Sequence, residues 1–301
     1  MSEPGQTWDV RGRRFVLDAP VLMGVLNVTP DSFSDGGAYL DADAAIARAR
    51  VLVADGAGII DVGGESTRPG ASRVEADEQI RRTVPVIEAI ARELDVALSI
   101  DTTDATVAEA AIDAGAGIVN DVSAGQDDDR ILALAAATGC GLVLMHRLKP
   151  PAHDVYSDQY ESSPAYTDVV RDVADHLVAR AAAARAAGVA AASIVLDPGL
   201  GFGKSVEQVF DLVRATPVLL EAGYPILSAA SRKSFIGAVT EVKAPADRMI
   251  GSAALSVAHW IGGCRIFRVH DVAVHREALA VAAAVTAGPA RREGSGGGGG
   301  R

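Results

Sequence analysis

Arg268 and His270 stand one residue apart at the end of an apolar run near the carboxyl terminus. In an extended strand this spacing places both side chains on the same face. A guanidinium group binds phosphate oxygens in a bidentate manner, and an imidazole adds a donor that can carry charge. The two residues therefore suit a diphosphate group. The alternative is a structural arginine that pairs with an acidic neighbour.

Four further polar residues end other apolar runs: Asp101, Asn120, Asp197 and Lys233. Charged side chains seldom lie in apolar surroundings unless they are paired. Two carboxylates and an amide can accept hydrogen bonds from the amino group and ring N–H of a 2-aminopyrimidinone, and a lysine can donate to its carbonyl. The alternative is an internal Asp–Lys ion pair that only fixes the fold, although buried ion pairs stabilise proteins weakly.

Asn27 ends the first apolar run, and loops containing Gly and Pro follow the first two runs, over residues 29–39 and 63–73. The amide oxygen of Asn27 is a ligand that Mg²⁺ accepts, and Mg²⁺ readily bridges phosphates. An asparagine that forms a turn is the alternative. Phe33 is an aromatic side chain in an otherwise polar loop. An aromatic lid over a flat substrate would explain it, because closed lids exclude water from reactive intermediates.

The elements that must position these residues are eight short apolar runs, each followed by a helical stretch. The runs predict strands at 21–28, 58–62, 96–100, 117–120, 142–145, 193–196, 225–229 and 265–269. Strand–helix alternation of this length indicates a parallel α/β fold, and eight repeats predict closure into a (β/α)8 TIM barrel. The polar residues at the carboxyl ends of the strands would then share one mouth.

The chain length of 301 residues fits one such barrel with modest additions, because a barrel typically takes about 250 residues. We expect residues 1–20 to form a β-hairpin lead-in that closes the bottom of the barrel. Residues 21–290 are predicted to form a single domain. The glycine-rich residues 291–301 are predicted to be a disordered tail.

Composition excludes several functional classes. The 39 acidic and 28 basic residues give a net charge of −11, which opposes binding to nucleic acid because that needs a basic face. Neither cysteine belongs to a metal-binding motif, and no uncharged apolar stretch approaches the length of a membrane span. We therefore expect a cytoplasmic protein that acts on small molecules. Four histidines are predicted to lie on the surface: His153, His176, His259 and His275.

The motifs around the polar residues occur in a recognisable order. They are Asn27–Gly37, Gly63–Gly70, Ser99–Thr102, Asn120–Asp121, Asp197–Lys204, Ser231–Gly237 and Arg268–Val272. Each motif is weak alone, but together they resemble the dihydropteroate synthase family, the folate-pathway enzymes that sulfonamides inhibit. The resemblance implies that 6-hydroxymethyl-7,8-dihydropterin diphosphate and 4-aminobenzoate condense to 7,8-dihydropteroate and diphosphate. It also implies a Mg²⁺ cofactor and a homodimer that packs through helices beside strands six to eight.

The resemblance also implies roles for individual positions. The implied pterin pocket comprises Asp101, Asn120, Met145, Asp197 and Lys233. The implied diphosphate contacts are Asn27, Thr67, Arg268 and His270, with Asn27 as the metal ligand. The implied aminobenzoate contacts are Phe33, Thr67, Arg68, Pro69, Phe202, Lys233 and Ser234. Catalysis is expected to depend on Asp101, Lys233, Arg268 and His270, in a dissociative step under closed loops.

Two other functions fit parts of the pattern. A pterin-binding methyltransferase that works with a corrinoid protein shares the barrel and the pterin pocket. Such an enzyme has no need of Arg268 and His270 for a diphosphate. A non-catalytic folate-pathway paralogue would bind pterin or a partner protein, but the presence of Asn27, Arg68 and Lys233 argues against it.

Overall fold

The computed structural model describes residues 6–28 and 38–287. Within them, eight parallel strands form one sheet in the order β8-β7-β6-β5-β4-β3-β10-β9. A parallel bridge between Leu196 and Ile226 joins the two ends of this order and closes the barrel. The predicted TIM barrel is confirmed. The strands are β3 (Val21–Asn27), β4 (Ile59–Gly63), β5 (Ala97–Asp101), β6 (Ile118–Asp121), β7 (Gly141–Met145), β8 (Ile194–Asp197), β9 (Leu227–Ser228) and β10 (Ile266–Val269).

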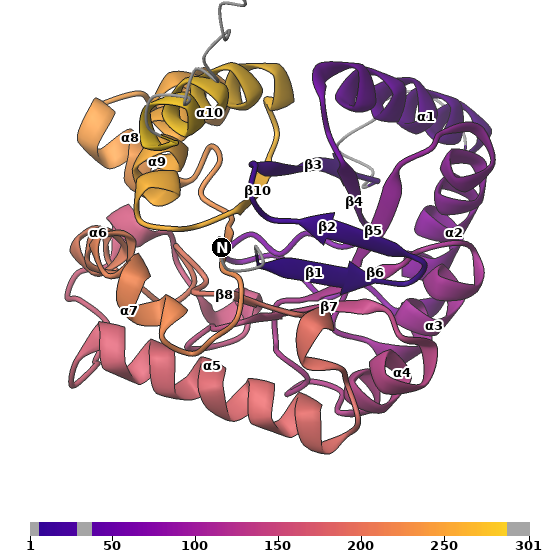
Figure 1. Cartoon of the computed structure of the whole chain (residues 1–301), viewed down its shortest axis with the longest axis horizontal. Helices are drawn as coiled ribbons and strands as arrows, with labels where there is room; N and C mark the ends of the chain where they lie inside the picture. The colour runs from indigo at the N-terminus through magenta and orange to yellow at the C-terminus, as the bar shows by residue number, and fades with distance from the viewer. Residues whose placement is uncertain (1–5, 29–37, 288–301) are drawn as a thin grey trace, which may run out of the picture.

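Helices surround the barrel on all sides, as Figure 1 shows. The α-helices are α1 (Ala38–Asp55), α2 (Ala76–Glu93), α3 (Ala105–Asp113), α4 (Arg130–Thr138), α5 (Val169–Ala186), α6 (Val206–Arg214), α7 (Thr216–Leu220), α8 (Ser234–Thr240), α9 (Met249–Ile261) and α10 (Val272–Thr286). Short 3₁₀ turns are η2 (Pro151–His153), η3 (Ser157–Gln159), η4 (Ala191–Ser193) and η5 (Pro245–Arg248). No helix in the described parts of the chain combines the length and apolar character needed to cross a membrane.

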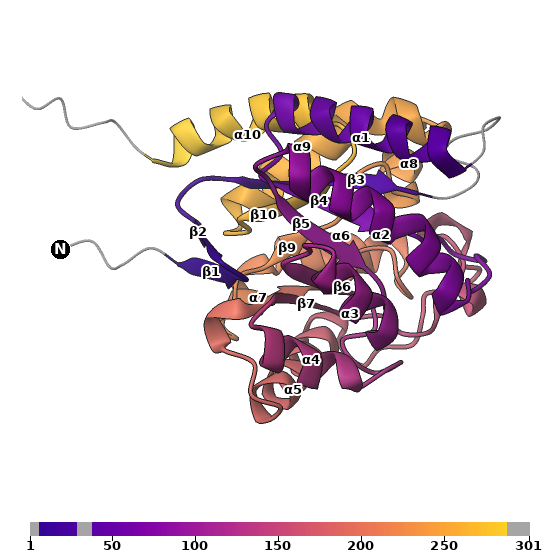
Figure 2. The same ribbon diagram turned by 90° about the vertical axis from the view of Figure 1, so that its right-hand side faces the viewer.

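An antiparallel hairpin precedes the barrel, as the sequence predicts. Its strands are β1 (Thr7–Val10) and β2 (Arg13–Val16), and it covers the end of the barrel opposite the carboxyl ends of the strands (Figures 1 and 2). Trp8 of β1 is fully buried, and its indole Nε1 donates a hydrogen bond to the Ser193 carbonyl at 3.0 Å. The hairpin therefore seals the bottom of the barrel with an aromatic side chain.

The interior of the barrel changes character along its axis. Near the hairpin, apolar side chains from the strands pack with Trp8; they include Met23, Ile59, Ala97, Val143, Val195 and Ile266. Towards the carboxyl ends, the inward positions become polar, because Asp61 follows Ile59 on β4 and Asp101 lies four residues beyond Ala97 on β5. The outward positions, such as Ile60, pack against the helices. Strand periodicity thus separates a helix-facing core from an interior that ends in a polar mouth.

Two histidines predicted to lie on the surface are buried instead. His259 of α9 is 1% exposed, and its Nδ1 lies 2.7 Å from Ser228 Oγ. His275 of α10 is fully buried and shares a helix face with Val272 and Leu279. The spacing of three and four residues is that of a buried helical stripe. Burial lowers the pKa of both histidines to about 4, so both are neutral at pH 7.

Candidate active site at the carboxyl ends of the strands

A cavity of about 570 Å³ opens at the carboxyl ends of the strands. Every predicted site residue within the described parts of the chain lines it: Asn27, Thr67, Arg68, Pro69, Asp101, Asn120, Met145, Asp197, Phe202, Lys233, Ser234, Arg268 and His270. Phe33 lies outside the described residues. Side chains from both ends of the sequence, such as Asn27 and His270, therefore surround one space, as closure of a barrel requires.

Arg268 forms two ion pairs with aspartates at the floor of this cavity, the end nearest the barrel interior. Its Nε donates to Asp61 Oδ2 at 2.6 Å, and its Nη2 donates to Asp101 Oδ2 at 2.7 Å. Asn120 Nδ2 donates to the same Asp61 oxygen at 3.1 Å. Arg268 is thus paired with acidic neighbours and also lines the cavity. Within the described residues no acceptor contacts its Nη1, which leaves that group for a ligand.

Asp61 is the residue that the sequence-based prediction of the site missed. It is fully buried and contacts both Arg268 and Asn120. Its position along the strand could have revealed it. Asp61 lies two residues after Ile59 and so shares the inward face of β4, where a carboxylate needs a partner inside the barrel. Ser231 was also missed as a site residue, although its motif was noted; it lines the cavity beside His270.

The floor has more hydrogen-bond acceptors than donors. Among the described residues, the Oδ1 atoms of Asp61 and Asp101 are buried without a hydrogen-bond partner, as is Ser99 Oγ. Asp61 pairs in register with Ser99 on the neighbouring strand, and Asp101 follows Ser99 on the same face. A buried polar atom without a partner costs about 1–3 kcal/mol. Of these residues only Asp101 lines the cavity, so its Oδ1 is the buried acceptor that an N–H group of a ligand would satisfy.

Burial also favours the neutral form of the floor carboxyls. Burial raises the pKa of Asp101, against the opposing charge of Arg268 and with a further increase from Asp61. Burial likewise raises the pKa of Asp197, and Lys233 opposes this shift. For Arg268, burial favours the neutral form, but Asp61 and Asp101 outweigh it, and the pKa is raised. The guanidinium is thus a permanent positive charge next to Asp101, whose pKa is raised.

Lys233 lies at the cavity wall between two structural contacts. Its Nζ donates to the Leu200 carbonyl, and it lies 4.4 Å from the centre of the Phe202 ring. No ion pair joins Lys233 to Asp197 in the described structure, so the fold-fixing Asp–Lys pair is absent there. Burial lowers the pKa of Lys233 to about 8, although Asp197 opposes the shift. Its remaining N–H groups are available to a ligand carbonyl.

His270 contributes a neutral donor or acceptor at the rim. Its Nδ1 lies 3.2 Å from Ser231 Oγ, and its backbone N–H donates to the same oxygen. Burial, together with the charges of Arg268 and Arg232, lowers its pKa to about 3. The imidazole is therefore uncharged at pH 7 in the ligand-free chain. Arg232 is itself held by Asp271, with Nε donating to Oδ2 at 2.8 Å.

The glycine-rich run 199–203 forms a tight turn around the side-chain nitrogen of Lys204. The buried Lys204 Nζ lies 2.9 Å from the Phe202 carbonyl, 3.0 Å from the Gly199 carbonyl and 2.9 Å from His146 Nδ1. Gly199 has a φ of +64°, and a Cβ at this position would lie 1.8 Å from the His146 carbonyl oxygen. This turn positions Phe202 in the cavity wall, and His146 serves as a core residue.

The residues present fit a Mg²⁺ ion only if a ligand completes its shell. Asn27 lines the cavity, and its carboxamide has no hydrogen-bond partner among the described residues. Clusters of three or more His, Cys, Asp or Glu that could hold a metal are absent from the described parts of the chain. Mg²⁺ commonly takes one or two protein oxygens together with phosphate and water oxygens. The donor set thus suits a metal that arrives with a diphosphate.

Comparison with known proteins assigns the family. The family model described as "Pterin binding enzyme" matches residues 23–270. Dihydropteroate synthase of Streptococcus pyogenes is 44% identical over 270 residues, which cover 89% of this chain and 97% of the relative. The chain belongs to the dihydropteroate synthase family.

Solved structures of this family share the fold. Dihydropteroate synthase of Xanthomonas albilineans with 4-aminobenzoic acid superposes with a TM-score of 0.86 at 41% identity, covering 95% of this chain and 100% of that one. The same organism's enzyme in complex with 7,8-dihydropteroate gives a TM-score of 0.83 at 38% identity, covering 94% and 100%. Both superpositions extend over nearly the whole barrel of this chain.

Proposed function

We propose that this chain condenses 6-hydroxymethyl-7,8-dihydropterin diphosphate with 4-aminobenzoate, giving 7,8-dihydropteroate and diphosphate for folate biosynthesis. In this reaction the bond between the pterin methylene and the diphosphate oxygen breaks. A bond forms between the methylene and the arylamine nitrogen, which loses a proton. The observation that carries the proposal is that one cavity combines an acceptor-rich floor with a cationic rim.

The floor recognises the pterin. The carboxyls of Asp101 and Asp197 and the amide of Asn120 accept from the amino group and ring N–H of the pterin, while Lys233 donates to its carbonyl and Met145 packs on the ring. The unpartnered Oδ1 of Asp101 supports this assignment, because a pterin N–H would satisfy it. Asp61 keeps Asn120 and Arg268 in place from below.

The rim binds the leaving diphosphate. Arg268, His270 and Thr67 contact its oxygens, and Asn27 would hold a Mg²⁺ ion, which would neutralise part of the diphosphate charge. Preorganised donors stabilise charge that develops as the diphosphate departs. Arg268 suits this role because its charge is permanent and its orientation is fixed by two carboxylates.

The step is dissociative. As the diphosphate leaves, positive charge develops on the pterin methylene, and the Asp101 carboxylate favours it. An arylamine is already unprotonated at neutral pH, so the attack needs no strong general base. Neutral His270 agrees with this chemistry, because it acts as a hydrogen-bond partner of the diphosphate and takes no proton from the amine.

The aminobenzoate site forms at the mouth of the cavity. Its wall consists of Phe33, Thr67, Arg68, Pro69, Phe202, Lys233 and Ser234. Arg68 pairs with the carboxylate of the substrate, and the loops at 29–39 and 63–73 close over it and exclude water. The stacking of Lys233 on Phe202 supports a shared wall between the two substrates.

The proposal includes a homodimer and a cytoplasmic location. Five aliphatic side chains on α8, α9 and α10 are at least 60% exposed: Val239, Ile250, Ile261, Val281 and Val285. Helices α9 and α10 lie side by side (Figure 1), and exposed apolar residues of this kind support an interface. Cys140 and Cys264 are buried free thiols, which suits a reducing compartment.

One assay tests the function. Release of diphosphate should require both the pterin diphosphate and 4-aminobenzoate, and EDTA should reduce it. Methyl transfer from methyltetrahydrofolate without diphosphate release would favour the methyltransferase instead. Binding of both ligands without turnover would favour a non-catalytic paralogue.

A further inference from the structure

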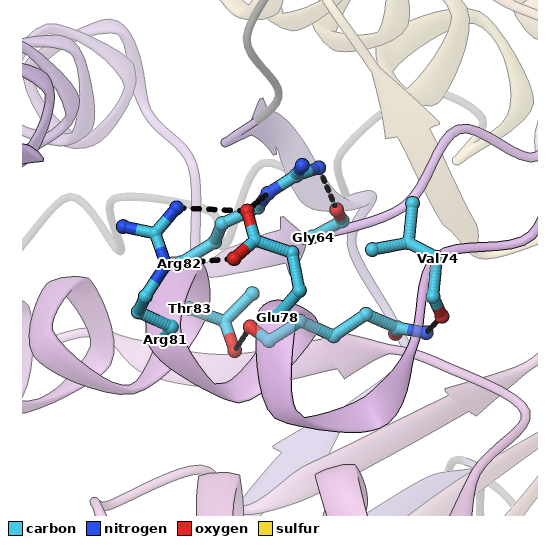
Figure 3. A network of polar contacts seen from close by, with 7 residues as sticks. Gly64, Val74, Glu78, Arg81, Arg82 and Thr83 are labelled. Carbon is cyan, nitrogen blue, oxygen red and sulfur yellow. Dashed lines mark hydrogen bonds and ion pairs between the residues drawn. The ribbon is translucent and has the colours of Figure 1, made fainter.

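Residues 64–75 form the loop between β4 and α2, which carries Thr67, Arg68 and Pro69. The base of this 64–75 loop is attached to the start of helix α2. Figure 3 shows the first contact: Arg82 Nη1 donates to the Gly64 carbonyl at 3.0 Å, while Glu78 holds the same guanidinium. Gly64 packs directly on the helix, because a Cβ there would lie 2.8 Å from Thr83 Cγ2. The loop therefore leaves β4 in contact with α2.

Gln79 makes the contacts that join the two sides of the loop. Its Nε2 donates to Glu65 Oε2 at 2.7 Å and to the Val74 carbonyl at 2.8 Å. Glu65 and Val74 lie at opposite ends of the loop, so a single amide group bridges the base. Gln79 is 3% exposed, and its Oε1 lies 3.4 Å from Thr102 Oγ1, next to Asp101.

Few contacts within the described structure restrain the loop between these two ends. The Gly70 N–H donates to the Pro151 carbonyl at 2.9 Å, and the Ala71 N–H donates to the Arg68 carbonyl at 3.0 Å. The cost of ordering a loop rises with the number of residues that are free to move. Because the bridge already holds Glu65 and Val74, only residues 66–73 remain to be ordered when substrate binds.

We propose that Gln79 is a positioning residue that ties the base of the 64–75 loop and thereby sets the affinity for the arylamine substrate. This inference rests on the proposed function for its kinetic consequence. Gln79 contacts no substrate; it acts through Glu65 and Val74, whose loop presents Thr67, Arg68 and Pro69 to the cavity. The proposed pterin contacts Asp101, Asn120 and Asp197 lie on β5, β6 and β8, whereas the loop follows β4.

A reversal of the hydrogen bond tests the proposal. Gln79→Glu places a carboxylate against Glu65 and the Val74 carbonyl, which removes both bonds. Glu65→Gln keeps an acceptor for the Gln79 amide and measures the loss of charge alone. In the double variant the amide at position 65 donates to the carboxylate at position 79, so one side of the bridge forms again with the opposite direction. Gln126→Glu adds the same charge at an exposed position on the same face of the barrel.

Steady-state kinetics give the first readout. Gln79→Glu should raise KM for 4-aminobenzoate on the order of 10-fold, with smaller changes in kcat and in the calorimetric affinity for the pterin diphosphate, which meets this loop only through Thr67. Made in the Glu65→Gln background, the same substitution should raise that KM less than about 3-fold. Equal effects in the two backgrounds would overturn the proposal, as would a Gln79→Glu variant that behaves like Gln126→Glu.

Hydrogen exchange gives a readout that needs no activity. Amides of residues 66–73 should exchange faster in Gln79→Glu than in the unmodified chain, and the double variant should restore part of their protection. Unchanged exchange in this loop would overturn the bridge. If the unmodified chain shows no condensation, the proposed function fails while the exchange experiment still decides the bridge. If Gln79→Glu does not fold, Gln79→Leu removes both hydrogen bonds without an added charge, and faster exchange of residues 66–73 in that variant then decides the bridge.

Discussion

The two halves of the barrel interior come from the same strands and differ completely in chemistry. On β4, Ile59 packs with Trp8 in the lower half, and two residues later Asp61 pairs with Arg268 in the upper half. On β10, Ile266 and Arg268 repeat the same change. The lower half and the helix-facing layer supply apolar burial, which drives folding. The upper half can therefore keep buried charges that contribute little to stability.

The contrast teaches that removal of a side chain should affect different properties in the two halves. Substitutions in the upper half should change turnover or its pH dependence. Substitutions in the lower half should change the free energy of unfolding and leave the kinetics intact.

Arg268→Ala should have the largest effect. It removes the permanent charge that faces the departing diphosphate, so kcat should fall on the order of 10²–10³-fold, while circular dichroism stays that of the folded barrel. Arg265→Ala is the matched control, because its guanidinium stacks on Trp260 at 4.0 Å, ahead of the start of β10. Turnover by Arg268→Ala equal to that of the control would refute the role of Arg268.

Trp8→Ala should be the counterpart in the lower half. Loss of this buried indole leaves a cavity at the barrel bottom and should lower the free energy of unfolding by about 3–5 kcal/mol, measured by urea denaturation. Trp8→Phe keeps most of the packing and loses the bond to Ser193, which should cost about 1 kcal/mol. A raised KM in either variant at a temperature where it is folded would contradict the division between the halves.

Lys233 should give the pH profile an alkaline limb. Burial lowers its pKa to about 8, and only the protonated form offers the pterin carbonyl a charged hydrogen-bond donor. The value of kcat/KM should therefore fall about 10-fold per pH unit above pH 8, because this ratio reports groups of the free enzyme. Lys233→Arg should be slower overall and should lack the limb. A flat profile to pH 10 in the unmodified chain would speak against this assignment.

His270 should show the smallest effect, visible by NMR. With its pKa lowered to about 3, its ring signals should not titrate between pH 5 and 8 in the free chain. Bound diphosphate places negative charge beside the ring and should raise the pKa. Folding lowers the pKa of His270, whereas folding raises the pKa of a histidine that gains an acidic partner. Below pH 6.5 the unfolded chain takes up a proton at this position and the native chain does not, so the free energy of unfolding falls as the pH drops below 6.5. Identical titrations with and without diphosphate would exclude a direct contact.

The prediction from sequence worked where a local rule applies. Alternation put Arg268 and His270 on one face of their strand, and the carboxyl-end rule for barrels gathered Arg268 with Asp101, Asn120, Asp197 and Lys233. The prediction was wrong for His259 and His275, because it placed them by their polarity and not by the helical spacing that puts both on buried faces. The roles of the site residues, the metal and the dimer stay predictions, and Phe33 lies outside the described residues.

The sequence by itself determined the order of strands and helices and the strand ends at which the predicted site residues lie, because both follow from local spacing along the chain. Only the tertiary structure decided which groups pair. Asp61 and Arg268 are 207 positions apart and meet because closure places β3 between β4 and β10. A buried charge pairs with the group that the closed barrel places beside it, and no short-range sequence pattern encodes which group that is.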